Sequence, residues 1–164
     1  MTDQESMLSL MRENIQLNHL SEQDFSQYSS SSNNNNDGSE WRLYPCKARV
    51  LNWGEKCPQE IFESSSVEVI FASDCVYHES IFEPLLSTLC ELSSRSRRAN
   101  EAAPTVTYLG FKKRWRSSKR FFALARKKFS LEKVAWRSSN FENFNRDSMT
   151  IYKMILKKEI KARS

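Results

Sequence analysis

The chain has 164 residues, 39% of them hydrophobic, and a net charge of +5, values that suit one domain with a single core. Its four cysteines include no CxxC pair, neither histidine stands at a ligand spacing from such a pair, and no apolar run is long enough to cross a bilayer, which argues against a zinc protein and a membrane protein. We therefore expect a reduced, metal-free protein of the cytoplasm, with the nucleus as a second location.

The first third of the chain predicts a helix, a loop and a strand. Apolar residues recur at helical spacing over residues 4–20, and Thr2 with Glu5 fits a capping box at the start of this helix. Residues 26–40, SQYSSSSNNNNDGSE, form a low-complexity Ser/Asn tract that cannot pack a core, so we expect a flexible surface loop. Residues 46–53, CKARVLNW, alternate as in a half-buried strand.

The rest of the chain alternates between strands and helices. The predicted strands are residues 67–72, 105–111, 130–136 and 149–156, the predicted helices are 79–92 and about 116–128, and the predicted connections include a polar linker at 93–104 and a loop at 137–147. This order implies an α/β fold with βαβ units and a mainly parallel sheet covered on both faces. The last two strands have no helix between them and should pair antiparallel at one edge.

The basic residues concentrate in the second half. Up to residue 94 there are 5 Lys and Arg against 15 Asp and Glu, and from Arg95 onward there are 20 against 5. One interpretation is a surface that binds an acidic protein or a nucleic acid. The other is that these residues solvate helix faces and strand ends, because in KKRWRSSKRFFALARKKF they are interleaved with apolar residues at helical spacing.

One stretch, VIFASDCVYHESIFEPLL (69–86), combines a buried strand with polar residues at its end. The apolar run stops at Ser73 and Asp74, and a helical pattern follows. Ligands of open α/β sheets bind at the carboxyl ends of strands. This rule places Asp3, Trp53 and residues 73–77 on one rim of the predicted sheet.

Several motifs together resemble a known family. MTDQESMLSLMRENIQLN resembles the end of the second strand and the following helix of class I, seven-β-strand methyltransferases, VLNWGE resembles their L-x-W-G-[DE] element, and ASDCVY resembles their D-x-x-Y motif. With EPLLSTLCEL, YLGFKKR and IYKMILKK, they are similar to the lysine methyltransferase branch called family 16 or methyltransferase-like 21, particularly to members that methylate valosin-containing protein. The resemblance covers nearly all of the chain except residues 26–40.

The resemblance implies a cofactor site for S-adenosylmethionine. Asp3 matches the acidic residue that binds the ribose hydroxyls, and Trp53 matches the tryptophan that flanks the adenine, while Ala72 and Ser73 lie where the backbone approaches the cofactor. The alternatives from the residues alone are that Asp3 caps a helix and that Trp53 is an ordinary core residue.

The resemblance also implies a substrate passage. Asp74 and Tyr77 match residues that line the opening through which a lysine amine reaches the methyl group, where alignment of the amine and exclusion of water assist the transfer. The alternatives are that Asp74 caps the helix that starts near Glu79 and that Tyr77 only packs. His78 is expected to be a surface residue, because nothing in the motif requires a histidine.

One part of the family pattern is missing. Class I methyltransferases carry a glycine-rich turn, E/D-x-G-x-G-x-G, after a first strand that lies between the second and fourth strands of the sheet. None of the three glycines, Gly38, Gly54 and Gly110, stands in such a turn. We therefore expect residues 1–164 to be a partial, Rossmann-like methyltransferase domain, from an incomplete or shortened product, whose fourth strand has an unpaired edge.

Two functions follow as hypotheses. The first is an S-adenosylmethionine-dependent protein-lysine N-methyltransferase, or its carboxyl-terminal part, acting on a protein substrate such as a chaperone or an AAA ATPase, with no membrane partner and no nucleic acid. The second is a catalytically inactive remnant or a basic binding module for an acidic protein or a nucleic acid.

Overall fold

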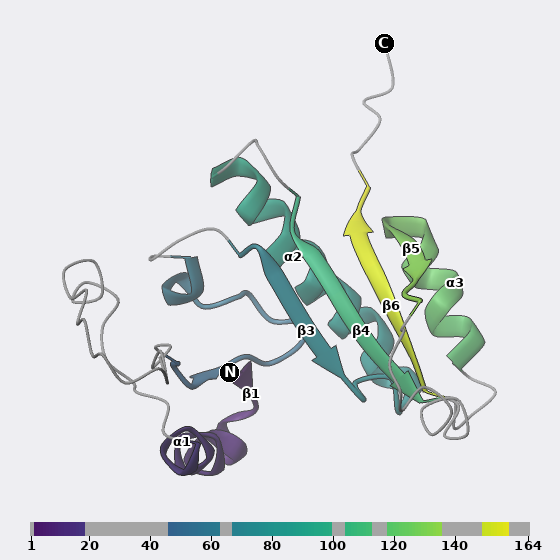
Figure 1. The fold of residues 1–164 in the computed structure, drawn as a ribbon. Helices are drawn as coiled ribbons and strands as arrows, with labels where there is room; N and C mark the ends of the chain where they lie inside the picture. The colour runs from purple at the N-terminus through teal and green to yellow at the C-terminus, as the bar shows by residue number, and fades with distance from the viewer. Residues whose placement is uncertain are drawn as a thin grey trace, which may run out of the picture. The chain divides into compact units, whose positions relative to one another are not determined.

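The computed structural model describes residues 2–18, 46–62, 67–99, 104–112, 118–135 and 149–157. These segments form a mixed α/β fold with two separate sheets (Figure 1). The chain divides into two compact units, Met1–Asn52 and Trp53–Ser164, each with its own sheet. The expected loops at 26–40 and 137–147 lie outside the described residues.

The first unit holds a short parallel strand pair and a helix. Strand β1 (Thr2–Asp3) pairs with β2 (Arg49–Val50), and between them in the chain come the 3-10 helix η1 (Glu5–Met7) and helix α1 (Leu8–Leu17). The capping-box prediction was wrong, because Thr2 belongs to a strand and no side chain caps η1. Strand β2 is shorter than the predicted strand at 46–53, since β1 offers only two residues for pairing.

The second unit is built on a four-stranded sheet with the order β3-β4-β6-β5 (Figure 1). Its strands are β3 (Val69–Ser73), β4 (Val106–Lys112), β5 (Phe129–Lys133) and β6 (Met149–Leu156). Strands β3 and β4 are parallel, whereas β6 pairs antiparallel with both β4 and β5. The predicted antiparallel pair at one edge is therefore confirmed.

Strand β3 is the other edge of this sheet, since among the described residues it pairs only with β4. Two sheets, one of two strands and one of four, stand where the family resemblance implies a single sheet.

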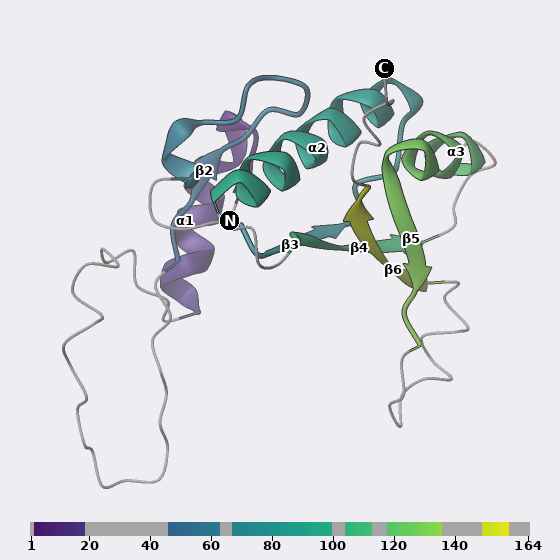
Figure 2. The same cartoon turned by 90° about the horizontal axis from the view of Figure 1, so that it is seen from above.

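Helices cover one face of the four-stranded sheet. The 3-10 helix η4 (Glu79–Ile81) leads into α2 (Phe82–Ala99), and α2 and α3 (Ser118–Lys128) lie on the same side of the strands (Figure 2). Their contact includes an edge-to-face pair of Phe82 and Phe121 with ring centroids 5.4 Å apart. Helix α2 extends seven residues into the predicted linker at 93–104, so that prediction was wrong for residues 93–99.

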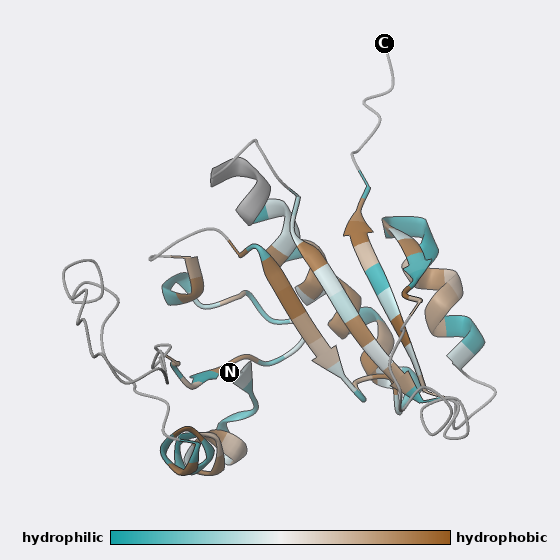
Figure 3. Cartoon of the chain, viewed as in Figure 1, coloured by the Kyte–Doolittle hydropathy of each residue, from teal (hydrophilic) through white to brown (hydrophobic). Residues whose placement is uncertain are grey.

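No helix among the described residues of the second unit packs on the opposite face of the four-stranded sheet, which differs from the expectation that both faces are covered. Strand β3 is hydrophobic along most of its length (Figure 3), yet Phe71 is 81% exposed and stacks on Tyr108 of β4 with ring centroids 5.7 Å apart. Alternate residues of a strand point to opposite faces, so the neighbouring Ala72 is buried beneath the helices.

No helix among the described residues is long and apolar enough to cross a membrane.

Candidate functional site

The carboxyl end of β3 forms a tight, left-handed turn. Ser73 is the last paired residue and lies opposite Gly110 of β4. The next residue, Asp74, has φ 55, a conformation that L residues rarely adopt and that Asp tolerates better than most. Its backbone N–H donates to the carbonyl oxygen of Gly110 at 3.1 Å, so the turn is tied to the neighbouring parallel strand.

This turn projects the two predicted substrate-binding side chains toward solvent. Asp74 is exposed, and Tyr77 is 54% exposed, which is a large exposed fraction for an aromatic side chain. The packing alternative for Tyr77 therefore does not hold. Between them, the Cys75 thiol donates to the Ser73 carbonyl oxygen at 3.3 Å.

The helix that follows is capped by His78 and not by Asp74. The Ser80 N–H donates to His78 Nδ1 at 3.3 Å, and the same nitrogen lies 2.8 Å from Ser80 Oγ. The structure thus removes the capping alternative for Asp74 and confirms His78 as an exposed surface residue. What Asp74 and Tyr77 do chemically stays a prediction.

Trp53 lies at the start of the second unit, on the helix-covered side of the sheet. Its ring is half-buried and packs against the core cluster that includes Phe82 and Leu85. The next residue, Gly54, has φ 88, and a Cβ added to it would lie 3.0 Å from Pro84 Cβ. Only glycine fits this backbone without strain, so the W-G pair is fixed by close packing on α2.

Asp3 belongs to the first unit, at the carboxyl end of β1. Its carbonyl oxygen accepts the Leu51 N–H at 2.9 Å, and its carboxylate Oδ1 accepts the Gln4 N–H at 2.7 Å. The carboxylate is exposed, and it does not cap η1, whose N-cap residue is Gln4. An exposed carboxylate at the end of a parallel strand has the chemistry needed to accept hydrogen bonds from ribose hydroxyls.

A groove of ≈ 550 Å³ opens on the uncovered face of the sheet. Its lining residues include Ser73 and Ala72 from the predicted cofactor site, although Ala72 also belongs to the buried core. The other lining residues are Phe71, Tyr108, Gly110, Val134 and Ile151. The sequence analysis missed these five residues. The available signal was strand periodicity, because residues two apart on β3 and their partners on β4 and β6 share one face.

The described cysteines do not form a redox or metal centre. All four are free thiols, and no group of three metal-binding side chains occurs in the described parts of the chain. Burial and then the neighbouring Glu91 carboxylate raise the pKa of Cys57 from 9.0 to about 12. A thiol with so high a pKa stays protonated and is a poor nucleophile near neutral pH.

Comparison with known proteins gives two findings. The sequence profile of a family described as "Lysine methyltransferase" matches residues 1–128. The protein-lysine N-methyltransferase EFM6 of Saccharomyces cerevisiae is 26% identical over an alignment of 162 positions, which covers 95% of this chain and 54% of the yeast protein. The chain therefore spans about half the length of the curated relative that it matches.

Proposed function

Since the chain belongs to the lysine methyltransferase family, we propose that it forms the substrate-facing part of a protein-lysine N-methyltransferase that uses S-adenosylmethionine. The observation that carries this proposal is the turn after β3, where a left-handed Asp74 is tied to β4 at the carboxyl end of a parallel strand pair. Strand ends of this kind bind ligands in open α/β sheets.

By the resemblance, four residues are proposed for the adenosine part of S-adenosylmethionine: Asp3 in the first unit, and Trp53, Ala72 and Ser73 in the second. In the proposal, the exposed Asp3 carboxylate binds the ribose hydroxyls, the Trp53 ring packs against the adenine, and the small residues Ala72 and Ser73 let the backbone approach closely. The cofactor supplies a methyl group on a sulfonium. Neither described glycine, Gly54 or Gly110, lies in a glycine-rich turn, so we propose no residue for the methionine part and expect weak cofactor binding by residues 1–164 alone.

The substrate side of the proposal rests on Asp74 and Tyr77. The Asp74 carboxylate accepts hydrogen bonds from the lysine amine and orients it, and the exposed Tyr77 ring covers the methylene chain of the lysine. A lysine amine must lose its proton before it can form a new N–C bond, and a nearby carboxylate can take part in that loss.

The proposed substrate is a protein with an accessible lysine, in keeping with the printed function of the yeast relative. The resemblance to members that methylate valosin-containing protein suggests a chaperone or an AAA ATPase as the partner. We further propose a cytoplasmic location, which the four free thiols support because disulfides are rare there.

The alternative of a basic binding module gains no specific support from the described residues. Two basic residues of α3 have structural partners: Arg120 pairs with Glu79 at 2.8 Å, and the Arg126 guanidinium lies 5.9 Å from the centroid of the Phe122 ring. The last turn of α3 carries Arg126, Lys127 and Lys128, where positive charge stabilises a helix through its dipole. Folding and solvation therefore account for these charges.

The test uses the Asp74→Asn variant. It is made in the longest protein product of the transcripts that encode residues 1–164. Asn tolerates the left-handed backbone and keeps the side-chain shape, so only the carboxylate is lost. With labelled S-adenosylmethionine and a protein extract, mass spectrometry should detect Nε-methyl-lysine with the unaltered protein and at least tenfold less with Asp74→Asn. The matched control is Glu83→Gln, an exposed acidic residue of α2, which should keep full activity. Absence of lysine methylation by the unaltered product would reject the proposed function.

A further inference from the structure

The segment after the predicted adenine-binding tryptophan is fastened along helix α2. We call residues 53–62 the strap; it ends in the 3-10 helix η3 (Gln59–Phe62). The Gly54 N–H donates to Thr88 Oγ1 at 2.9 Å, and the Cys57 N–H donates to Glu91 Oε2 at 3.1 Å. Residues three apart lie on one face of a helix, so these two bonds follow a single line along α2.

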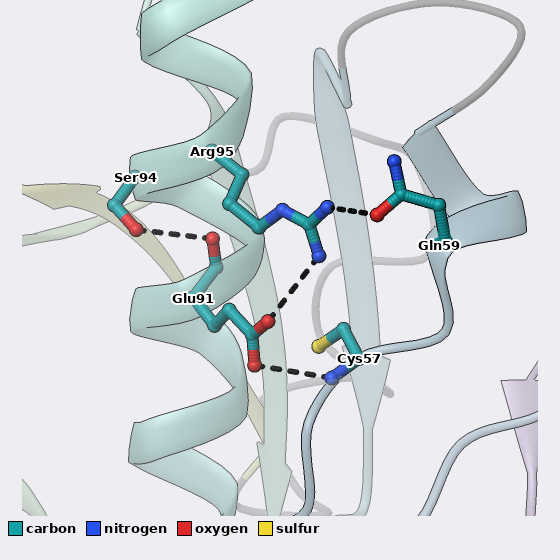
Figure 4. A network of polar contacts seen from close by, with 5 residues as sticks. All are labelled: Cys57, Gln59, Glu91, Ser94 and Arg95. Atoms are coloured by element: carbon teal, nitrogen blue, oxygen red, sulfur yellow. Dashed lines mark hydrogen bonds and ion pairs between the residues drawn. The ribbon is translucent and has the colours of Figure 1, made fainter.

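A third set of contacts holds the far end of the strap on α2. Arg95 Nη2 donates to Gln59 Oε1 at 2.6 Å, and its guanidinium lies 3.8 Å from the centroid of the Phe62 ring. Arg95 Nη1 also contacts Glu91 Oε1 at 3.4 Å, so one carboxylate serves both the strap and the arginine (Figure 4). These contacts fix the strap on α2 over its whole length.

The most constrained of these contacts is the hydrogen bond nearest Trp53, which the Gly54 N–H donates to Thr88 Oγ1. Thr88 is 2% exposed, so water hardly competes for its hydroxyl, and Gly54 is pressed against Pro84 on its other side. Pro84 and Thr88 are one helical turn apart, and together they fix the backbone directly after Trp53. The orientation of the Trp53 ring thus depends on a buried hydroxyl 35 positions later in the chain.

We propose that Thr88 is a positioning residue for Trp53: by holding the Gly54 N–H, its hydroxyl sets the orientation of the ring that meets the adenine and thereby controls affinity for S-adenosylmethionine without contacting it. This inference rests on the proposed function for the role of Trp53. The positioning itself rests on the contacts described above and can be measured without any ligand.

The ligand-free test uses Trp53 as the reporter. In a chain with Trp41, Trp115 and Trp136 replaced by Phe, Thr88→Val keeps the side-chain shape and removes the hydroxyl. We expect Thr88→Val to shift Trp53 fluorescence to longer wavelength and to increase its quenching by acrylamide at least twofold. Thr88→Ser, which keeps the hydroxyl, should restore both values.

The control for general destabilisation is Thr105→Val. Thr105 is a buried threonine at the start of the β4 segment whose hydroxyl donates to the Val67 carbonyl oxygen at 2.7 Å. The Thr105→Val variant should have a lower free energy of unfolding, but the emission wavelength and acrylamide quenching of Trp53 should stay unchanged. An unchanged Trp53 signal in Thr88→Val, or an equal change in Thr105→Val, would overturn the positioning role.

The second measurement links positioning to the ligand. In titrations with S-adenosylmethionine at up to millimolar concentration, Thr88→Val should weaken binding about fivefold, the effect of roughly one hydrogen bond, and Thr88→Ser should bind like the unaltered chain. Equal affinity in Thr88→Val and the unaltered chain would overturn the claim about affinity. If no variant binds, the affinity claim fails together with cofactor use by residues 1–164, while the fluorescence result still decides the positioning role.

Discussion

The amide of Asp74 and the carbonyl of Gly110, 3.1 Å apart, join the turn after β3 to the next strand and hold an aspartate in a left-handed conformation. This bond places the DCVY motif at the edge where β3 and β4 both end. The motif is thus positioned by the backbone, with Asp74 and Tyr77 exposed and with Cys75 and Val76 partly buried against the core.

The left-handed backbone predicts a specific order of stabilities at position 74. Asp74→Gly and Asp74→Ala remove the same carboxylate, but only glycine adopts φ 55 without steric cost. We expect Asp74→Gly to have a free energy of unfolding about 1 kcal/mol higher than Asp74→Ala, as measured by urea denaturation. Equal values would mean that the turn is not left-handed in solution.

The two described glycines should respond differently to alanine. Gly54 has φ 88, and a Cβ on it would lie only 3.0 Å from Pro84 Cβ, whereas a Cβ on Gly110 would meet Ser73 Oγ at an ordinary 3.7 Å. Gly54→Ala should lower the free energy of unfolding by about 2 kcal/mol, and Gly110→Ala should change it by less than about 0.5 kcal/mol. Urea denaturation of the two variants side by side measures the difference; a larger loss in Gly110→Ala would contradict the packing described.

Two buried threonines of the β4 segment should give opposite results on replacement by valine. Thr107 Oγ1 is buried with no hydrogen-bond partner among the described residues, whereas Thr105 Oγ1 donates to Val67. Thr107→Val should therefore raise the free energy of unfolding by about 1 kcal/mol, and Thr105→Val should lower it by a similar amount. Thermal or urea unfolding of both variants checks the signs; destabilisation by Thr107→Val would reveal a partner for that hydroxyl.

The exposed face of the four-stranded sheet predicts self-association of residues 1–164. Phe71 is 81% exposed on an edge strand, and Val69 on the same face is 46% exposed. Phe71→Thr keeps strand propensity and should shift the chain toward monomer in light scattering coupled to size exclusion, with little change in stability. The control is Leu17→Thr, which removes a 68% exposed leucine at the end of α1 and should leave the mass distribution unchanged.

The raised pKa of Cys57, about 12, predicts a loss of stability in alkaline solution. In the unfolded chain this thiol ionises near 9.0, so between pH 9 and 12 the unfolded state binds fewer protons than the folded state, and stability falls as pH rises. The stability advantage of the unaltered chain over Cys57→Ala should therefore shrink above pH 9, by at most about 1.4 kcal/mol per pH unit. A difference that stays constant from pH 8 to 10.5 would contradict the raised pKa.

The sequence predicted the elements whose stability comes from local pattern. A run of apolar residues identified β4, and helical spacing identified α3. The linker prediction failed at residues 93–99 because Ser and Arg look solvated in sequence, whereas Ser93 is buried and Arg95 packs on Phe62. Such contacts depend on residues distant in the chain, which periodicity does not report.

The candidate site also combines features that the sequence predicted with features that it did not. Motif resemblance pointed to Asp74 and Tyr77, and the structure places both on one exposed turn. The Gly54–Thr88 bond joins residues 34 apart and leaves no mark in local composition. The uncovered sheet face was also missed, because alternation indicates that a strand has two faces and does not indicate what covers each one.

Few positions on helix α2 can accept different side chains, because most of its faces are packed. One side enters the core through Leu85, Leu89 and Leu92, and another holds the strap through Thr88 and Glu91. Over residues 82–95, where its side chains are described, only Glu83 and Ser87 are exposed. A saturation library should therefore retain broad amino-acid diversity at these two positions and little elsewhere in the segment, so that sequence drift in this helix is confined to them.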